Sequence, residues 1–252
     1  MRFTRKVKEA LSINNQTEPQ DSSQCQSSPR RRFLHTTVAG ATLGLVSNLG
    51  LSAISSRTAF AQSTITPDGA LEELKAGNQR FLSRKLTAHE HDLDILKEKT
   101  IDKQEPFAAV LSCADSRVPV ELIFDQSIGH IFVTRVAGNV ITPEIIASLE
   151  YGAAVLGTEV IVVMGHASCG AVKASMQGKE VPGQISALFP HIQPAVNQAG
   201  ASLEECTKAN AKIQATLLSE SSTVISGLLK QGKVKVVAAY YDFATGKVDF
   251  LS

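Results

Sequence analysis

The stretch Glu159-Val-Ile-Val-Val-Met-Gly165 decides the fold class of this chain. It is a short, nearly continuous apolar run rich in β-branched residues, which is typical of a strand buried on both faces of a sheet. Three other runs have the same character: Phe107–Cys113, His130–Val136 and Val234–Tyr241. Helical patterns lie between these runs, over residues 119–124, 143–156 and 201–230. The alternation predicts an α/β fold, a single domain with a central, mainly parallel sheet and flanking helices.

Two further segments complete the expected domain. Asp68 to Arg84 has the pattern of an amphipathic helix ahead of the first strand, and we expect it to pack across a neighbouring element or a second subunit. Asp242 to Leu251 contains the turn signal Ala-Thr-Gly and predicts a terminal antiparallel edge strand. We therefore divide this part of the chain into an N-terminal helical arm, residues 62–105, and an α/β catalytic core, residues 106–252.

Residues 1–61 have the pattern of a twin-arginine export signal. The run Arg30-Arg31-Arg32 precedes the apolar stretch Val38–Leu51, and Ala59-Phe-Ala61 is an A-x-A cleavage motif. The apolar stretch is short for a membrane span, which needs roughly 20 residues. We predict cleavage after Ala61 and no stable membrane span in the mature protein, the alternative being an uncleaved N-terminal anchor. The expected destination is the periplasm or, in a photosynthetic cell, the thylakoid lumen.

Charge and cysteine content narrow the function further. Residues 62–252 carry 17 basic and 21 acidic side chains, a balance that argues against nucleic acid as a partner. The three cysteines of this part cannot all pair, and we interpret Cys206 as a lone thiol in a helical segment. Twin-arginine export carries proteins that are already folded. Cysteines that bind a metal in the cytoplasm would therefore be protected from oxidation at an oxidising destination.

Cys113, His166 and Cys169 form a candidate metal site. Cys113 ends the first predicted strand and His166 follows the third, so both belong to the sheet edge at which open α/β sheets bind ligands. Three protein ligands leave a fourth position open, as in catalytic zinc sites. Asp115 and Arg117 are spaced to form an ion pair beside the metal. Each residue alone has a structural alternative, and a disulfide between the two cysteines would explain neither the histidine nor the Asp/Arg pair.

The motifs Cys113-Ala-Asp-Ser-Arg-Val118 and Gly165-His-Ala-Ser-Cys-Gly-Ala171 resemble the two signature motifs of the β-class carbonic anhydrases. The likeness extends over essentially all of residues 62–252. It implies one Zn²⁺ per subunit, held by Cys113, His166 and Cys169. It also implies that Asp115 and Arg117 form a catalytic pair, which accepts a hydrogen bond from the metal-bound water and orients it. The family assembles from dimers, so the resemblance implies a homodimer or a dimer-based higher oligomer.

The resemblance also indicates a substrate pocket of the plant-type branch. Gln104, Phe132 and Tyr151 stand at the spacing of the residues that line it, and the two aromatic residues are expected to face the neighbouring subunit's metal. Ala137 belongs to the same pocket and replaces a larger apolar residue of the plant pattern, while Pro119 replaces a cysteine. The chain contains no Trp, which argues against the bicarbonate regulation of the bacterial branch.

The function implied by this resemblance is the reversible hydration of carbon dioxide to bicarbonate and a proton by metal-bound hydroxide. Two alternatives remain open: a carbonyl sulfide or carbon disulfide hydrolase on the same scaffold, and a non-enzymatic zinc-binding protein. The second is disfavoured because Asp115, Arg117 and Gln104 would have no role in a closed structural site.

Overall fold

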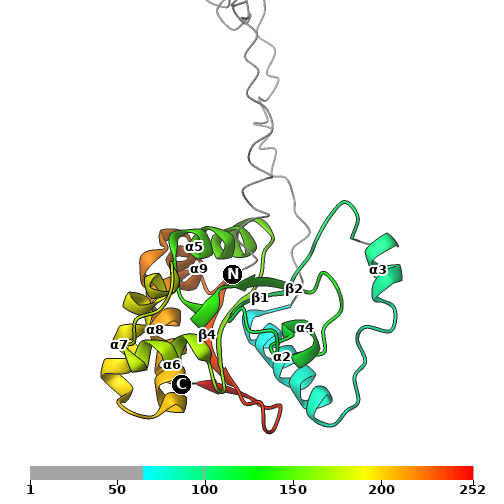
Figure 1. Ribbon diagram of the computed structural model, residues 1–252. Helices are drawn as coiled ribbons and strands as arrows, with labels where there is room; N and C mark the ends of the chain where they lie inside the picture. Colours follow the sequence, from blue (N-terminus) through cyan, green and yellow to red (C-terminus); the bar gives the residue numbers. More distant parts are fainter. Residues whose placement is uncertain (1–64, 99, 252) are drawn as a thin grey trace, which may run out of the picture. The chain divides into compact units, whose positions relative to one another are not determined.

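The structure is a computed structural model, and it describes residues 65–98 and 100–251 (Figure 1). The predicted export signal, residues 1–61, lies outside the described residues, as do the first residues of the predicted arm. Within the described part of the chain, no helix is both long enough and apolar enough to cross a membrane.

A five-stranded sheet forms the centre of the described part (Figure 1). The strands lie in the order β2-β1-β3-β4-β5; the first four run parallel, and β5 pairs with β4 in the antiparallel direction. The predicted α/β class, the mainly parallel sheet and the antiparallel edge strand are therefore confirmed. The strands are β1 (Ala108–Ser112), β2 (Ile131–Arg135), β3 (Val160–His166), β4 (Lys235–Tyr241) and β5 (Val248–Leu251).

Helices cover both faces of this sheet (Figure 1). The first face carries α2 (Pro67–Leu82) and α4 (Val120–Ile123). The second face carries α5 (Pro143–Glu150), α8 (Leu203–Ser221) and α9 (Thr223–Lys230), with α6 (Gly170–Gln177) and α7 (Phe189–Ala199) packed beside α8. A separate short helix, α3 (Asp92–Glu98), contributes no buried residue.

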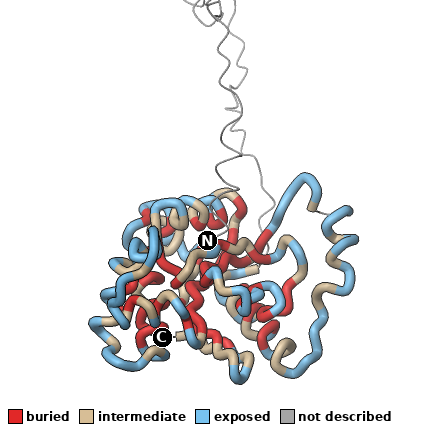
Figure 2. Tube along the Cα trace, in the orientation of Figure 1, coloured by how far each residue is buried: buried red, intermediate tan, exposed pale blue. Residues whose placement is uncertain are grey.

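The apolar runs are continuous because each strand is buried on both faces. In β1, Ala108 and Val110 belong to the cluster under α2 and α4, whereas Ala109 and Leu111 belong to the cluster under α5, α8 and α9. All four side chains are inaccessible to solvent, and the strands form the buried centre in Figure 2. This is the pattern of a parallel strand whose crossover helices cover both sides.

Helix α2 packs on the sheet of its own chain. It begins at Pro67 and is capped by Thr66, whose hydroxyl accepts a hydrogen bond from the Gly69 N–H. Gly77 lies against the backbone of Phe124, and a Cβ there would come within 1.8 Å of the Phe124 carbonyl oxygen. Only glycine permits so close an approach. The predicted partner of this helix is therefore an element of the same chain.

Helix boundaries were predicted less well than strands. The segment 201–230 is two helices because Ser222 has an extended backbone (φ −96°, ψ 113°), and its hydroxyl caps α9 by accepting from the Ile225 N–H. The predicted helix 143–156 changes to a π-helical turn over Tyr151–Val155. The predicted helices include no counterpart of α3, which is short and has no buried residue, or of α7, which contains Pro190 and Pro194.

Asp125 is a buried carboxylate that ties α2 to the end of α4. It accepts hydrogen bonds from Arg80 Nε at 2.5 Å, from the Thr87 hydroxyl at 2.9 Å and from the Ala88 N–H at 2.9 Å. The Thr87 N–H donates to the same carboxylate. Burial by itself would raise the pKa of Asp125, but the donors, first among them Arg80, lower it to about 2. The ionised carboxylate is thus a stabilising part of the fold.

We predict that Asp125→Asn lowers the free energy of unfolding by about 2 kcal/mol at pH 7, since a pKa lowered by nearly two units corresponds to a stabilisation of that size. The pKa is lower in the folded than in the unfolded protein. The wild-type advantage is therefore complete above about pH 4 and is lost as the pH falls from about 4 towards 2. Urea unfolding of both proteins across this range measures it. Asp94→Asn, at an exposed carboxylate of α3, is the matched control. Equal stability of Asp125→Asn and the wild type at pH 7 would contradict the prediction.

Candidate metal centre

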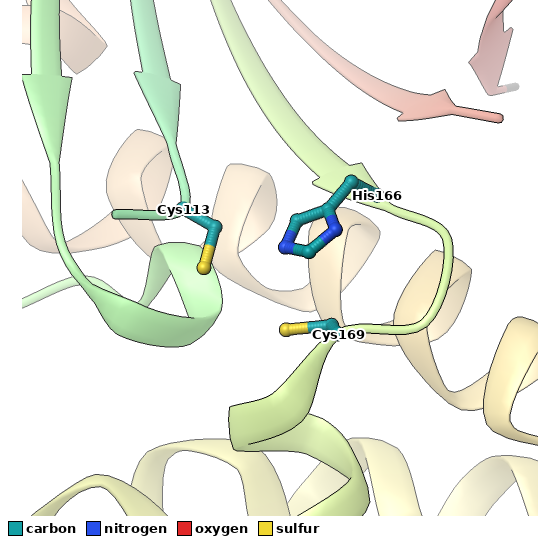
Figure 3. A group of neighbouring side chains, drawn as sticks. All are labelled: Cys113, His166 and Cys169. Atoms are coloured by element: carbon teal, nitrogen blue, oxygen red, sulfur yellow. The ribbon is translucent and has the colours of Figure 1, made fainter. Parts of the chain in front are cut away.

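Three side chains from separate elements converge at the carboxyl end of the sheet (Figure 3). Cys113 directly follows β1, His166 is the last residue of β3, and Cys169 is the N-cap residue of α6. One ligand atom from each side chain lies within 4.8 Å of the others, and all three residues are buried. The structure therefore brings together the three residues that the sequence places on one metal.

His166 is oriented with one nitrogen towards the sulfur atoms. Its Nδ1 lies 2.9 Å from the Ala167 carbonyl oxygen, to which it donates a hydrogen bond, so the proton belongs on Nδ1 and the lone pair on Nε2. Nε2 is buried and has no hydrogen-bond partner among the described residues. A buried polar atom without a partner is costly in a closed fold. The cost is removed if Nε2 binds a cation.

The two cysteines differ in acidity. The pKa of Cys113 is lowered, chiefly because Cys169 donates a hydrogen bond to its sulfur; the Gly138 N–H, 3.3 Å from the sulfur, acts in the same direction. The pKa of Cys169 is raised, because it is the donor to Cys113 and is buried. A divalent cation that binds both sulfur atoms would displace any proton that the two thiols still carry.

Cys169 also lies at the N-terminus of α6, where helix N–H groups favour a thiolate. The N–H groups of Ala171 and Val172 do lower the pKa of Cys169, but the hydrogen bond to Cys113 and burial outweigh them. The helix end contributes, but the neighbouring sulfur has the larger effect on the pKa of Cys169.

Asp115 and Arg117 form a forked ion pair at the rim of this centre. Arg117 Nε donates to Asp115 Oδ1 at 2.9 Å, and Arg117 Nη2 donates to Asp115 Oδ2 at 2.7 Å. The guanidinium of Arg117 holds the pKa of Asp115 well below its usual range, although partial burial opposes this shift. Asp115 Oδ2 lies 3.9 Å from His166 Nε2. An ionised carboxylate is thus held at the edge of the space that Nε2 and the sulfur atoms face.

The predicted substrate-binding residues divide into two groups. Ala137 directly precedes Gly138, whose N–H donates to the Cys113 sulfur, so the backbone of Ala137 lies beside the candidate metal centre. Phe132 pairs in register with Ala109, four residues before Cys113 along parallel strands. At 3.3 Å per residue, this places Phe132 roughly 13 Å from Cys113.

Gln104 and Tyr151 belong with Phe132. The Tyr151 and Phe132 ring centroids are 6.3 Å apart, and Gln104 and Tyr151 line one surface pocket that contains none of the three metal-centre residues. Within one chain, these three residues are not brought to the metal centre. That the two aromatic residues face a neighbouring subunit's metal stays a prediction.

Sequence reasoning missed two side chains that shape the site. Arg135, the last residue of β2, donates from Nε to the Cys113 carbonyl oxygen at 3.0 Å and from Nη2 to the Asp115 carbonyl oxygen at 2.5 Å. Phe243 stacks on the His166 ring and lies under the Arg117 guanidinium. Arg135 could have been found from its position at a strand end of the same sheet edge. Phe243 gave no such signal, because it is far from both motifs in the sequence.

The donor set fits zinc. Two cysteine sulfurs and an imidazole nitrogen are ligands that Zn²⁺ prefers, and three of them leave a position for a reacting molecule. The unpartnered Nε2 of His166, which faces the two sulfur atoms, is the feature that such a cation would satisfy. Cys206 is buried nearby but is not part of the three-residue cluster, which agrees with a lone thiol.

Sequence comparison identifies relatives of this chain. The sequence model of the family described as "Carbonic anhydrase" matches residues 108–248. A carbonic anhydrase from Mycolicibacterium smegmatis is 34% identical over 194 residues, which cover 74% of this chain and 94% of that protein. Carbonic anhydrase 2 from Mycobacterium tuberculosis is 33% identical over 189 residues, which cover 72% of this chain and 91% of that protein.

The fold has solved counterparts. The structures described as two tetrameric β-carbonic anhydrases from Sordaria macrospora include a chain that superposes with a TM-score of 0.59. The match covers 72% of this chain and 96% of that chain, at 19% sequence identity. At that identity the comparison establishes the shared fold, in agreement with the sheet order and the two helical layers described above.

We predict that Cys169→Ser abolishes stoichiometric zinc binding, because a serine hydroxyl stays protonated at neutral pH and leaves two strong ligands. The matched control is Cys206→Ser, which removes another buried thiol that is not in the cluster. Metal analysis of the purified proteins after dialysis measures the difference. If Cys169→Ser keeps one zinc per chain, or Cys206→Ser loses it, the ligand assignment is wrong.

Proposed function

This chain belongs to the carbonic anhydrase family, and from that premise we propose that it hydrates carbon dioxide reversibly to bicarbonate and a proton, using one Zn²⁺ per subunit. One observation carries the proposal: the unpartnered His166 Nε2 and the two cysteine sulfurs converge beside an ionised carboxylate, Asp115 Oδ2, 3.9 Å from Nε2. A structural zinc site has no use for a carboxylate held at its rim.

Zinc in this position would act as a Lewis acid that makes water nucleophilic near neutral pH. The residues of the chain would orient that water. Asp115 accepts hydrogen bonds and, with its pKa far below the usual range, is ionised at neutral pH. Because Arg117 occupies one side of the carboxylate with two hydrogen bonds, the rest of Asp115 Oδ2 is free to accept a hydrogen bond from a water in the space that Nε2 faces.

Arg117 and Arg135 limit how Asp115 can move. Arg117 fixes the carboxylate, and Arg135 fixes the backbone carbonyl of the same residue. We infer that Asp115 therefore stays paired with Arg117 rather than becoming a fourth metal ligand. The fourth position is then open to water and substrate.

The substrate pocket would be completed by a second copy of the chain. Phe132 lies roughly 13 Å from Cys113 along the strands. Tyr151 contacts Phe132, and Gln104 lines a surface pocket with Tyr151. Tyr151 is 46% exposed, so its ring is available to a neighbouring molecule. The solved relatives from Sordaria macrospora are described as tetrameric. In this arrangement, the apolar rings would hold carbon dioxide and Gln104 would donate to its oxygen, on which charge develops.

We also propose the plant-type branch on the basis of Gln104, Phe132 and Tyr151, and twin-arginine export to the periplasm or the thylakoid lumen on the basis of Arg30 and Arg31. Residues 1–61, which carry the export proposal, lie outside the described residues.

The first test of this proposal is Asp115→Asn. If Asp115 orients the reacting water, the variant keeps zinc and fold but hydrates carbon dioxide roughly 10²-fold more slowly. Stopped-flow hydration assays, with zinc content and thermal unfolding measured on the same samples, check this. Asp94→Asn, an exposed carboxylate on α3, serves as control. Full activity of Asp115→Asn would remove Asp115 from the mechanism, and wild-type activity on carbonyl sulfide but not on carbon dioxide would favour the hydrolase alternative.

The second test asks whether Gln104 serves the metal of a partner subunit. Chains carrying Gln104→Ala are refolded together with chains carrying Cys113→Ser, each inactive alone. In a mixed dimer, one site combines intact metal ligands from one chain with an intact Gln104 from the other. We therefore expect one of the two sites in each mixed dimer to be active.

The matched control for this mixture replaces Gln104→Ala by Asp115→Asn. Asp115 lies beside the metal residues of its own chain, so that mixture should regain nothing. Equal failure of both mixtures would show that Gln104 acts within its own chain or not at all.

A further inference from the structure

The Phe243 ring contacts two side chains at the candidate metal centre. Its ring stacks on the His166 ring, with centroids 5.2 Å apart and an interplanar angle of 29°. Arg117 Cζ lies 4.3 Å from the centre of the same ring. The aromatic ring therefore contacts both a metal-centre residue and the cation that holds Asp115.

The ion pair of Arg117 with Asp115 needs such support. Just over half of the Arg117 side chain, 54%, is exposed to solvent. A solvent-exposed ion pair contributes little by itself, because water screens it and the long side chain loses rotamer freedom on forming it. A cation over an aromatic face is attracted to the ring, and the flat ring also restricts the guanidinium to one plane.

The turn that carries Phe243 is closely fixed. Phe243 follows β4 in a turn closed by the backbone hydrogen bonds Asp242 N–H to Lys247 O (2.9 Å) and Gly246 N–H to Asp242 O (2.8 Å). The Asp242 carboxylate accepts from the Ala244 N–H and the Thr245 hydroxyl. Gly246, at φ +77°, supplies the left-handed residue that the turn requires.

Helix α2 holds this turn from outside. The Asn78 side chain is buried; it donates to the Gly246 carbonyl oxygen at 3.1 Å and accepts from the Val248 N–H at 2.9 Å. Its amide nitrogen also donates to the Ile123 carbonyl oxygen at 3.1 Å. The position of Phe243 is thus determined by the fold and does not depend on Arg117.

We propose that Phe243 is a positioning residue of the active site. Its aromatic face holds the Arg117 guanidinium in the orientation in which it donates two hydrogen bonds to Asp115. The ring acts through Arg117 and does not touch the reacting atoms. This inference rests on the proposed role of Asp115, and its failure is distinguishable: if Asp115→Asn slows hydration but loss of the Phe243 ring does not, only the inference about Phe243 is wrong.

Phe243→Leu removes the aromatic face and keeps apolar bulk. We expect kcat/KM for hydration to fall about 10-fold, with zinc content and thermal unfolding equal to those of Phe250→Leu, the matched control. Phe250 lies in β5 of the same hairpin and packs on Phe124, away from the metal centre. Phe243→Tyr keeps the ring face and should retain wild-type activity. Full activity of Phe243→Leu, or an equal loss in Phe243→Tyr, would overturn the proposal.

Two further measurements separate positioning from general packing. In an Arg117→Ala background, Phe243→Leu should cause almost no additional loss of kcat/KM, because the group through which it acts is gone; an undiminished 10-fold loss would overturn the proposal. In Co²⁺-loaded protein, the visible absorption of Phe243→Leu should differ from that of the wild type and match that of Arg117→Ala. An unchanged Phe243→Leu spectrum would count against the proposal.

If Phe243→Leu does not fold, phenylalanine at this position can be replaced by ring-fluorinated analogues of nearly the same shape. Stepwise fluorination weakens the negative ring face, so kcat/KM should fall stepwise with it. An activity that is independent of fluorination would overturn the proposal.

Discussion

The pairing of β1 with β3 is the constraint on which the rest of the site depends. The two strands are parallel neighbours, and Ser112 at the end of β1 pairs in register with Met164. Their ends therefore reach the same sheet edge, where Cys113 and His166 leave the sheet together. A turn through Ser168, at φ +54°, then returns the chain so that Cys169 caps α6 beside them. A shift of β3 by one residue would turn His166 to the other face of the sheet.

Most polar groups around this edge form hydrogen bonds with one another. His166 Nδ1 donates to the Ala167 carbonyl oxygen, and the Gly138 N–H donates to the Cys113 sulfur. The Arg135 guanidinium donates to two backbone carbonyl oxygens. Nε2 of His166 is one of the buried atoms here that have no hydrogen-bond partner among the described residues, and it is the one that faces the two sulfur atoms. Its orientation follows from the hydrogen bonds of its neighbours, which is how outer contacts usually define a metal ligand.

The same principle extends to the periphery of the domain. Asn78 in α2 fixes the β4–β5 hairpin, and the hairpin places Phe243 against His166 and Arg117. A helix that precedes the first strand is thereby connected to the metal centre through one amide side chain and one turn. In contrast, Phe132 and Tyr151 lie back along the strands and on the surface, so one chain presents its metal centre and its aromatic pair at separate places. This separation is the physical basis for proposing that two copies share a site.

The sequence by itself determined the strands, the α/β class and the three residues of the metal centre. Apolar runs of strand length report burial on both faces, and residues placed at the ends of parallel strands must meet at one edge. Tertiary structure alone decided the remaining features. At the break between α8 and α9, the Ser222 hydroxyl donates at 2.6 Å to the Glu150 carboxylate, 72 residues earlier in the chain. The lowered pKa of Cys113 depends on how closely the Cys169 sulfur approaches it. Phe243 reaches Arg117 only because a hairpin closes 126 residues later in the chain, and no local pattern encodes a contact over such a distance.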